Sequence, residues 1–187
     1  MRHADHAIDP HFMSRMSTRA FVPEPLSHDE LMRLFEAARW APSSSNGQPW
    51  RFVYAHRDTA AWGPLFDLLV PFNQAWAKDA SVLVVVLSET KYQDMPMRNH
   101  SFDAGAAWMS LALQAEHQGL VAHAMGGYDV DKARAFLHLG DHIDVDCMVA
   151  IGKRGDPQRL PEPLREREVP STRKPLSELV FEGKLPG

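Results

Sequence analysis

Residues 39–52 read R-W-A-P-S-S-S-N-G-Q-P-W-R-F, the most informative stretch of the chain, and join an amphipathic helix to a strand. Ser43, Ser44 and Ser45 stand with Asn46 and Gln48 between two prolines, and each proline is next to or near a tryptophan. A helix-to-strand connection needs only a few residues and one turn residue. Here it carries many neutral hydrogen-bonding groups between rigid apolar flanks, which suits a flat ligand rich in acceptors. An ordinary Ser/Asn/Gly turn is the alternative interpretation.

The helix before this loop is marked by its start, its spacing and its end. Ser27 and Glu30 form a capping box, S-x-x-E. Apolar side chains then recur at helical spacing, beginning with Leu31 and Leu34. Pro42 cannot continue a helix. The sequence therefore predicts a helix over residues 27–41.

Strands and helices alternate along the rest of the chain. The expected strands cover residues 51–56, 81–87, 120–125 and 145–152. The expected helices cover residues 58–70, 101–119, 130–139 and a short stretch near 176–181. The run S-V-L-V-V-V-L at 81–87 is typical of a strand covered on both faces. This alternation predicts an α/β or α+β sheet with helices on both sides.

The remaining segments are irregular. Residues 1–8 are expected to form a flexible N-terminal tail, followed by one domain over residues 9–187. The polar segment 89–100 could be a flexible lid over a site. After Gly155 the chain is rich in proline and charge, which predicts an extended C-terminal arm.

Composition narrows the function. The chain has 187 residues, a net charge of −4 and no long apolar run. These features argue against a nucleic-acid partner and against a membrane span. The N-terminus lacks an apolar signal core, so we expect a cytoplasmic protein. Because Cys147 is the sole cysteine, a dithiol redox pair is impossible, and any redox chemistry would need a cofactor.

Two polar clusters outside the loop could hold a ligand. In an extended segment Arg15, Ser17 and Arg19 share a face, which makes a good phosphate clamp. The basic stretch S-T-R-K at 171–174 adds charge near the C-terminus. A solvated basic patch is the alternative for each.

Gly126 and Gly127, after a short strand, would let a backbone approach a flat ring, although a plain turn is an equal alternative.

Several familiar sites have no counterpart in the sequence. It holds no G-x-G-x-x-G after a strand, no P-loop, no G-x-S-x-G elbow and no H-E-x-x-H. Gly140 interrupts the helix between His138 and His142, which argues against a metal pair, and no metal is expected. We assign no catalytic acid or base. His123, beside the glycine turn, is a weak candidate for proton transfer, and we favour its interpretation as a core histidine.

Four stretches of the sequence, taken in their order along the chain, resemble motifs of the FMN-dependent nitroreductase family. R-M-S-T-R-A-F at 15–21 is similar to the family's R-R-S-x-R-x-F, and residues 38–52 are similar to A-x-x-A-P-S-S-x-N-x-Q-P-W-x-F. D-A-G-A-A at 103–107, followed by M-G-G-Y-D at 125–129, is similar to the central helix and its glycine turn. R-K-P-L-S-E at 173–178 is similar to the family's terminal R-K-P-L-x-E.

The resemblance implies an α+β, three-layer α/β/α sandwich with a mostly antiparallel sheet and an extended C-terminal arm. It also implies a homodimer with two interfacial FMN sites. Arg15, Ser17, Arg19 and Arg173 would hold the phosphate and ribityl chain, and Met16, which replaces the motif's second arginine, would contribute its backbone. Asn73 would form a hydrogen bond with the pyrimidine edge of the isoalloxazine ring. Gly126 and Gly127 would place backbone N–H groups near the flavin atoms N5 and O4. The loop residues Ser43, Ser44, Asn46 and Gln48 complete the implied set, with the serines and Asn46 reaching the partner's FMN.

The reaction that the resemblance implies is a ping-pong hydride transfer from NAD(P)H through FMN to a small acceptor such as a nitroaromatic or quinone. Two alternatives stay open. The protein could be a flavin-binding sensor or carrier with little turnover. It could also be a family variant that acts on halogenated, enal or semialdehyde substrates. The motifs do not identify the acceptor.

Overall fold

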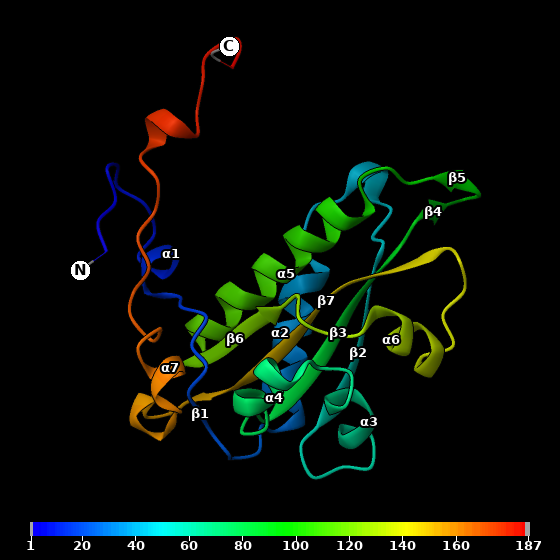
Figure 1. The fold of residues 1–187 in the computed structure, drawn as a ribbon. Coiled ribbons are helices and arrows are strands. Elements are labelled where there is room, and N and C mark those ends of the chain that lie inside the picture. The colour runs from blue at the N-terminus through cyan, green and yellow to red at the C-terminus, as the bar shows by residue number, and fades with distance from the viewer. Residues whose placement is uncertain (1, 186–187) are drawn as a thin grey trace.

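A five-stranded antiparallel sheet runs through the centre of the molecule, whose computed structural model describes residues 2–185 (Figure 1). Its strands are β1 (Phe21–Val22), β2 (Trp50–His56), β3 (Val82–Glu89), β6 (Leu120–Met125) and β7 (Ile143–Arg154). Four of them lie in the order β6-β7-β3-β2. Strand β1 pairs with Lys153 and Arg154 of β7, past Ile151, where the pairing of β7 with β3 ends. The short strands β4 (Lys91–Tyr92) and β5 (Met95–Pro96) form a separate hairpin.

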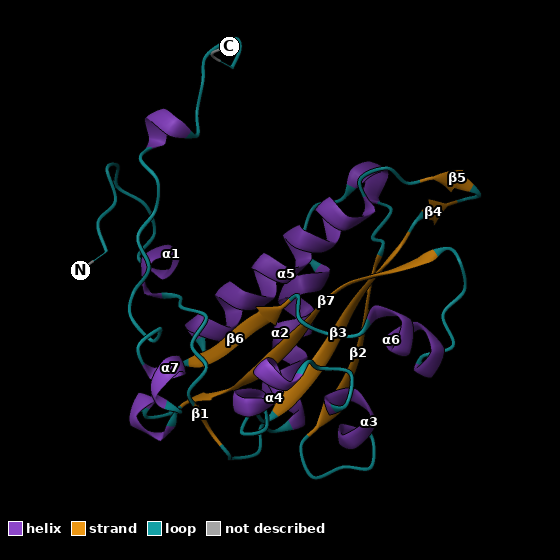
Figure 2. Ribbon diagram, in the orientation of Figure 1, coloured by secondary structure: helices purple, strands orange, loops and turns teal. Residues whose placement is uncertain are grey.

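Helices cover both faces of the sheet (Figure 2). They are α1 (His11–Ser14), α2 (His28–Arg39), α3 (Trp62–Phe66), α4 (Pro71–Ala77), α5 (His100–His117), α6 (Val130–Phe136) and α7 (Glu162–Arg165). Short 3-10 turns are η1 (Ser44–Asn46), η2 (Pro157–Arg159) and η3 (Leu176–Glu178). Helices α2 and α5 pack on one face, whereas α3, α4 and α6 pack on the other. The expected three-layer sandwich with an antiparallel sheet is confirmed.

Strand β3 explains why the sheet needs both layers. Its side chains alternate between the two cores: Val82, Val84 and Val86 face α2 and α5, and Leu83 and Val85 face the opposite helices. All five are at most 1% exposed. A β-branched run of this kind fits a pleated strand that is buried on both sides.

The two principal helices of one layer begin and end where the sequence indicates. The capping box of Ser27 and Glu30 is formed at the start of α2, with the Ser27 hydroxyl accepting from the Glu30 amide. Helix α5 ends just before Gly119, which has a φ of 71° and so takes the left-handed conformation that glycine favours. The predictions for these helices are confirmed to within two residues at each end.

The prediction of one helix over residues 58–70 is wrong. Only α3 forms there, with five residues. Asp58 has a φ of 66°, so no helix begins at that residue. Sequence analysis also missed α4, which begins with Pro71 in the first helical position. Residues 89–100, expected to be irregular, hold the β4–β5 hairpin.

The two ends of the chain lie side by side along one flank of the sandwich (Figure 1). The segment from Arg2 to β1 runs beside the C-terminal arm, residues 155–185, which extends away from the sheet toward η3. No helix among residues 2–185 is both long and apolar enough to cross a membrane.

Candidate functional site

A groove of about 830 Å³ lies between the N-terminal segment and the C-terminal arm. Arg15 and Arg173, which are far apart in the sequence, both line it. So does Arg2, from the segment expected to be a tail. Met109 of α5 contributes an apolar wall. The structure therefore brings two of the predicted phosphate-binding arginines together and adds a third.

The three guanidinium groups lie around a pair of serine hydroxyls. Arg173 Nη1 donates to Ser171 Oγ at 2.9 Å, and Arg2 Nη2 donates to the same oxygen at 3.3 Å. Arg15 Nη1 donates to Ser17 Oγ at 3.3 Å, so Arg15 and Ser17 do share a face. Within residues 2–185, none of these arginines forms an ion pair with a carboxylate. The groove is thus a cationic site with hydroxyl groups beside it.

Two of the arginines that line this groove each have a buried nitrogen without an acceptor. The Nε atoms of Arg2 and Arg15 are both buried, and no described group accepts a hydrogen bond from either. Burial lowers the pKa of Arg2, and the nearby charges of Arg173 and Arg15 lower it further. Buried donors without partners and crowded like charges are both stabilised by an anion. The donor set fits a phosphate group, which accepts several such hydrogen bonds.

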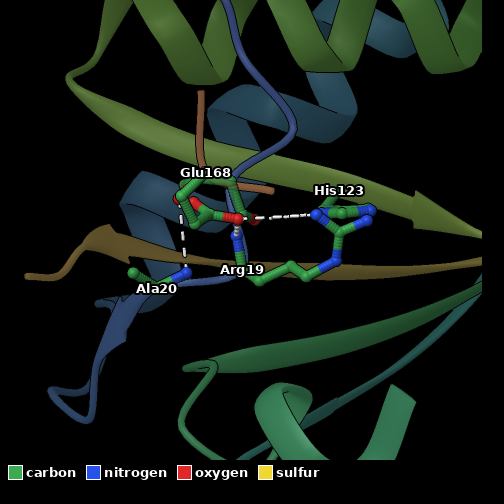
Figure 3. A network of polar contacts seen from close by, with 5 residues as sticks. Arg19, Ala20, His123 and Glu168 are labelled. Carbon is green, nitrogen blue, oxygen red and sulfur yellow. Dashed lines mark hydrogen bonds and ion pairs between the residues drawn. The ribbon is translucent and has the colours of Figure 1, made fainter. Parts of the chain in front are cut away.

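Arg19 lies in different surroundings, within a buried network around Glu168 (Figure 3). The Glu168 carboxylate accepts from the Arg19 amide at 2.9 Å and from the Thr18 hydroxyl. Arg19 Nη1 lies 3.5 Å from Glu168 Oε1, and the guanidinium lies 6.0 Å from the centre of the Trp76 ring. Of the three predicted side chains in this segment, Arg15 alone lines the groove, and Ser17 is linked to it by the hydrogen bond from Arg15. The half-buried Met16 lies between them in the chain.

His123 belongs to the same network. Its Nδ1 lies 3.0 Å from the Thr18 carbonyl oxygen, which can only accept, so Nδ1 carries the proton. The ring centre lies 4.6 Å from that of Trp76. Burial lowers the pKa of His123, chiefly by disfavouring the charged form. His123 is therefore a neutral, buried histidine that supports the segment behind the groove.

The Gly126–Gly127 turn is rigid on one side and open on the other. Asn73 Nδ2 donates to the Gly127 carbonyl at 2.9 Å, and the Val70 amide donates to the same oxygen at 3.1 Å. A Cβ atom on Gly127 would lie 2.7 Å from Asn73 Nδ2, whereas one on Gly126 would meet no atom within 4 Å. The buried Asn73 thus holds the turn, and Gly126 leaves room for a ligand.

The polar loop at residues 43–48 is held in an unusual conformation. Ser45, Asn46 and Gln48 have φ values of 52°, 54° and 46°. The buried Asp103 carboxylate accepts from the Ser44 amide at 3.0 Å. Such left-handed residues cost energy and persist where surrounding contacts fix them.

Two of the predicted loop side chains serve the loop itself. Ser43 Oγ accepts from the Gln48 amide at 3.0 Å, and Gln48 Nε2 donates to the Asn46 carbonyl at 3.1 Å. The side chains of Ser44 and Asn46 are exposed, and in the described part of the chain they make no hydrogen bond. The loop therefore presents two polar side chains with their hydrogen-bonding capacity unused.

The loop and the cationic groove do not meet within one chain. Ser44 and Ser45 line a different cleft, of about 590 Å³, against Tyr92 and Met95 of the β4–β5 hairpin. No described residue lines both this cleft and the groove. The predicted site residues thus fall into separate groups on a single chain. No group of three or more potential metal ligands occurs among residues 2–185.

Sequence reasoning missed Arg2 and Glu168. Arg2 stands in a polar N-terminal stretch, and Glu168 stands in a charge-rich arm with many similar residues. Neither position has a periodic or motif signal. Their roles come from contacts between the two ends of the chain, which no local pattern reveals.

Known proteins share this arrangement of strands, helices and motifs. The nitroreductase family model matches residues 12–61 and 59–153. A crystal structure described as an oxidoreductase containing FMN is 46% identical, with a TM-score of 0.96, covering 100% of this chain and 96% of that one. An NADH dehydrogenase of Thermus thermophilus is 28% identical over 90% of this chain and 92% of its own length. A putative NADH dehydrogenase/NAD(P)H nitroreductase of Rhodopseudomonas palustris is 30% identical over 76% of each chain.

Proposed function

The chain belongs to the nitroreductase family, and we propose that it is an FMN-dependent oxidoreductase that uses NAD(P)H to reduce a small acceptor, such as a nitroaromatic or a quinone. When bound, FMN supplies the hydride transfer of a ping-pong cycle. The observation that carries this proposal is the cationic groove, where three guanidinium groups without carboxylate partners lie together. The protein's own part is to bind and orient the reactants.

Arg15, Ser17 and Arg173 are the residues that would hold the FMN phosphate. The two arginines line the groove, and Ser17 Oγ lies within hydrogen-bond distance of Arg15. Because Arg19 is engaged with Glu168, we assign it chiefly to fixing the extended segment, with Met16 contributing backbone. Guanidinium–phosphate contacts are charge-assisted and strong, so this end of the ligand anchors the whole.

The glycine turn would support the flat ring. Gly126 has open space at its Cα, which lets a ring approach the backbone, and Asn73 fixes the turn from behind. Amide groups aimed at a ring that gains negative charge stabilise its reduced form. We keep Asn73 as a contact for the pyrimidine edge through the part of its amide that Gly127 does not use.

The exposed loop would complete the site from a partner subunit. The side chains of Ser44 and Asn46 bond to no described group of their own chain, and Ser44 lines a cleft separate from the groove. A twofold dimer repeats every surface, so a loop from one copy can meet the groove of the other. We therefore propose a homodimer in which Ser43, Ser44, Asn46 and Gln48 belong to the partner's FMN site.

A spectroscopic experiment tests the function. The purified protein, supplied with FMN, is expected to show a flavin absorption band that NADH or NADPH bleaches within seconds and that a nitroaromatic or quinone restores. Bleaching by dithionite alone would instead identify a flavin sensor or carrier. A protein that stays colourless after addition of FMN would contradict the proposal.

Charge removal in the groove tests the placement of the cofactor. Arg15→Ala combined with Arg173→Ala is expected to release FMN while leaving the circular dichroism spectrum unchanged. Arg33→Ala is the matched control, because Arg33 lies on the exposed side of α2 with its side chain 62% exposed. Full retention of FMN by the double variant would show that the phosphate binds elsewhere.

A further inference from the structure

Arg2 is held in place by the backbone of the segment that it faces. Its Nη1 donates to the carbonyl oxygens of Met13 and Arg15, both at 2.7 Å. Its Nη2 reaches across to Ser171 Oγ on the C-terminal arm, at 3.3 Å. The guanidinium thus spans the two sides of the groove, and its plane is fixed by three contacts.

Two N–H groups of this guanidinium have no partner among the described residues. Arg2 Nη2 carries two hydrogens and donates only one of them, to Ser171 Oγ. Arg2 Nε is buried, and no described atom accepts from it, as is also true of Arg15 Nε. The Ser171 oxygen shared by Arg2 and Arg173 is a neutral acceptor and does not offset two positive charges. Like charges this close repel each other unless an anion lies between them.

We propose that Arg2 is a third arginine of the phosphate site and donates to the phosphate of FMN from the N-terminal side of the groove. The inference rests on the proposed function, which assigns this groove to the cofactor. Arg2 then does two things: it fixes the backbone of Arg15, and it contributes a charge of its own. The simpler interpretation, in which Arg2 only anchors the N-terminal segment, predicts the first effect without the second.

A comparison of two flavins, made with and without Arg15, separates these interpretations, because an Arg2 that acts only by holding the Arg15 backbone has no further effect on phosphate binding once Arg15 is replaced. Riboflavin has the same ring and ribityl chain as FMN but lacks the phosphate, so the ratio of their dissociation constants reports contacts to the phosphate. Both ligands are titrated into the full-length, flavin-free protein, with quenching of flavin fluorescence as the signal. The variants are Arg2→Ala, Arg2→Lys, Arg15→Ala and the double variant Arg2→Ala with Arg15→Ala, and Arg33→Ala is the control.

Arg2→Ala is expected to weaken FMN binding about tenfold, the effect of losing one charge-assisted hydrogen bond. Riboflavin binding should change by less than about twofold, since no charged contact is lost. Salt should weaken FMN binding less steeply in the variant. Arg2→Lys, which keeps a point charge without the fixed fork of donors, should lie between Ala and wild type.

The other possible outcomes test the placement of FMN and the role of Arg2 separately. If wild type binds both flavins equally, the groove does not hold the phosphate, and the proposed placement of FMN fails first. If wild type prefers FMN but Arg2→Ala weakens both flavins alike, or lowers the preference for FMN only while Arg15 is present, Arg2 is only an anchor and the inference is overturned. Should Arg2→Ala not fold by circular dichroism, Arg2→Lys decides: an unchanged FMN-to-riboflavin ratio overturns the inference.

Discussion

At the scale of single residues, the buried Glu168 carboxylate organises the region behind the groove. It joins the C-terminal arm to the Thr18 hydroxyl and the Arg19 amide, and His123 contacts the Thr18 carbonyl from the sheet (Figure 3). A buried carboxylate is tolerated when its oxygens are hydrogen-bonded, as they are here. The network also includes His123, whose burial lowers its pKa and whose protonation in mild acid would disturb the network.

His123 should make the protein less stable in mild acid. Because burial lowers its pKa when folded, the unfolded chain binds this proton more readily, and stability falls as pH drops below the ordinary histidine value of about 6.5. The slope can reach ~1.4 kcal/mol per pH unit. Urea unfolding at several pH values should show a weaker dependence in His123→Asn, which keeps a donor toward Thr18. Parallel curves for both proteins would contradict this assignment.

At the scale of elements, the turn between β6 and α6 combines two glycines with different tasks. Gly127 is packed against Asn73 of α4, so it belongs to the structure, whereas Gly126 faces open space. A matched pair of substitutions can therefore separate stability from binding within two adjacent residues.

Gly127→Ala should destabilise the protein by about 1–3 kcal/mol, because the added methyl group breaks the hydrogen bond from Asn73. Gly126→Ala should leave the free energy of unfolding nearly unchanged and weaken FMN binding by at least about tenfold, since the methyl group occupies the space proposed for the ring. Urea unfolding and flavin titration measure the two effects. Equal behaviour of the two variants would rule out the division of roles.

Much of the element structure follows from local signals. The run of valines in β3, the capping box at Ser27 and the glycine after α5 each act through neighbouring residues, so sequence reasoning finds them. The failure over residues 58–70 has a local cause as well. Asp58 takes a left-handed conformation that its residue type allows but does not require, so the sequence alone does not reveal it.

At the scale of the whole molecule, the proposed site needs two copies of the chain. The groove lies between the N-terminal segment and the arm, whereas the loop lies beside the β4–β5 hairpin, and no described residue belongs to both cavities. Two chains with complementary defects should therefore repair each other.

One chain would carry Arg15→Ala with Arg173→Ala, and the other Ser44→Ala with Asn46→Gly, because glycine tolerates the left-handed backbone at Asn46. Each protein alone should bind FMN weakly. After mixing and subunit exchange, about a quarter of the wild-type FMN sites should return, since half of the dimers are mixed and each holds one intact site. Absence of recovery in mixed dimers, verified by mass spectrometry, would exclude a shared site.

The candidate site was only partly predictable from the sequence, because it is assembled from segments that lie far apart in the chain. Arg15, Ser17 and Arg173 could be proposed because their motifs are local and retain their spacing. Arg2 and Glu168 could not, because each acquires its surroundings from the opposite end of the chain. The meeting of the two termini is a tertiary property, and residues defined by it have no signature of their own.

The position of β3 in the sheet also has a consequence for synthesis on the ribosome. This most apolar strand pairs with β2, which is already made, and with β7, which follows only after α5, β6 and α6. At ~5–20 residues per second, one edge of β3 stays uncovered for several seconds during translation. Until β7 is made, the apolar V-L-V-V-V-L strand has an unpaired edge and is prone to aggregation. Slow synthesis or a shortage of chaperones should therefore lower the soluble yield of the protein.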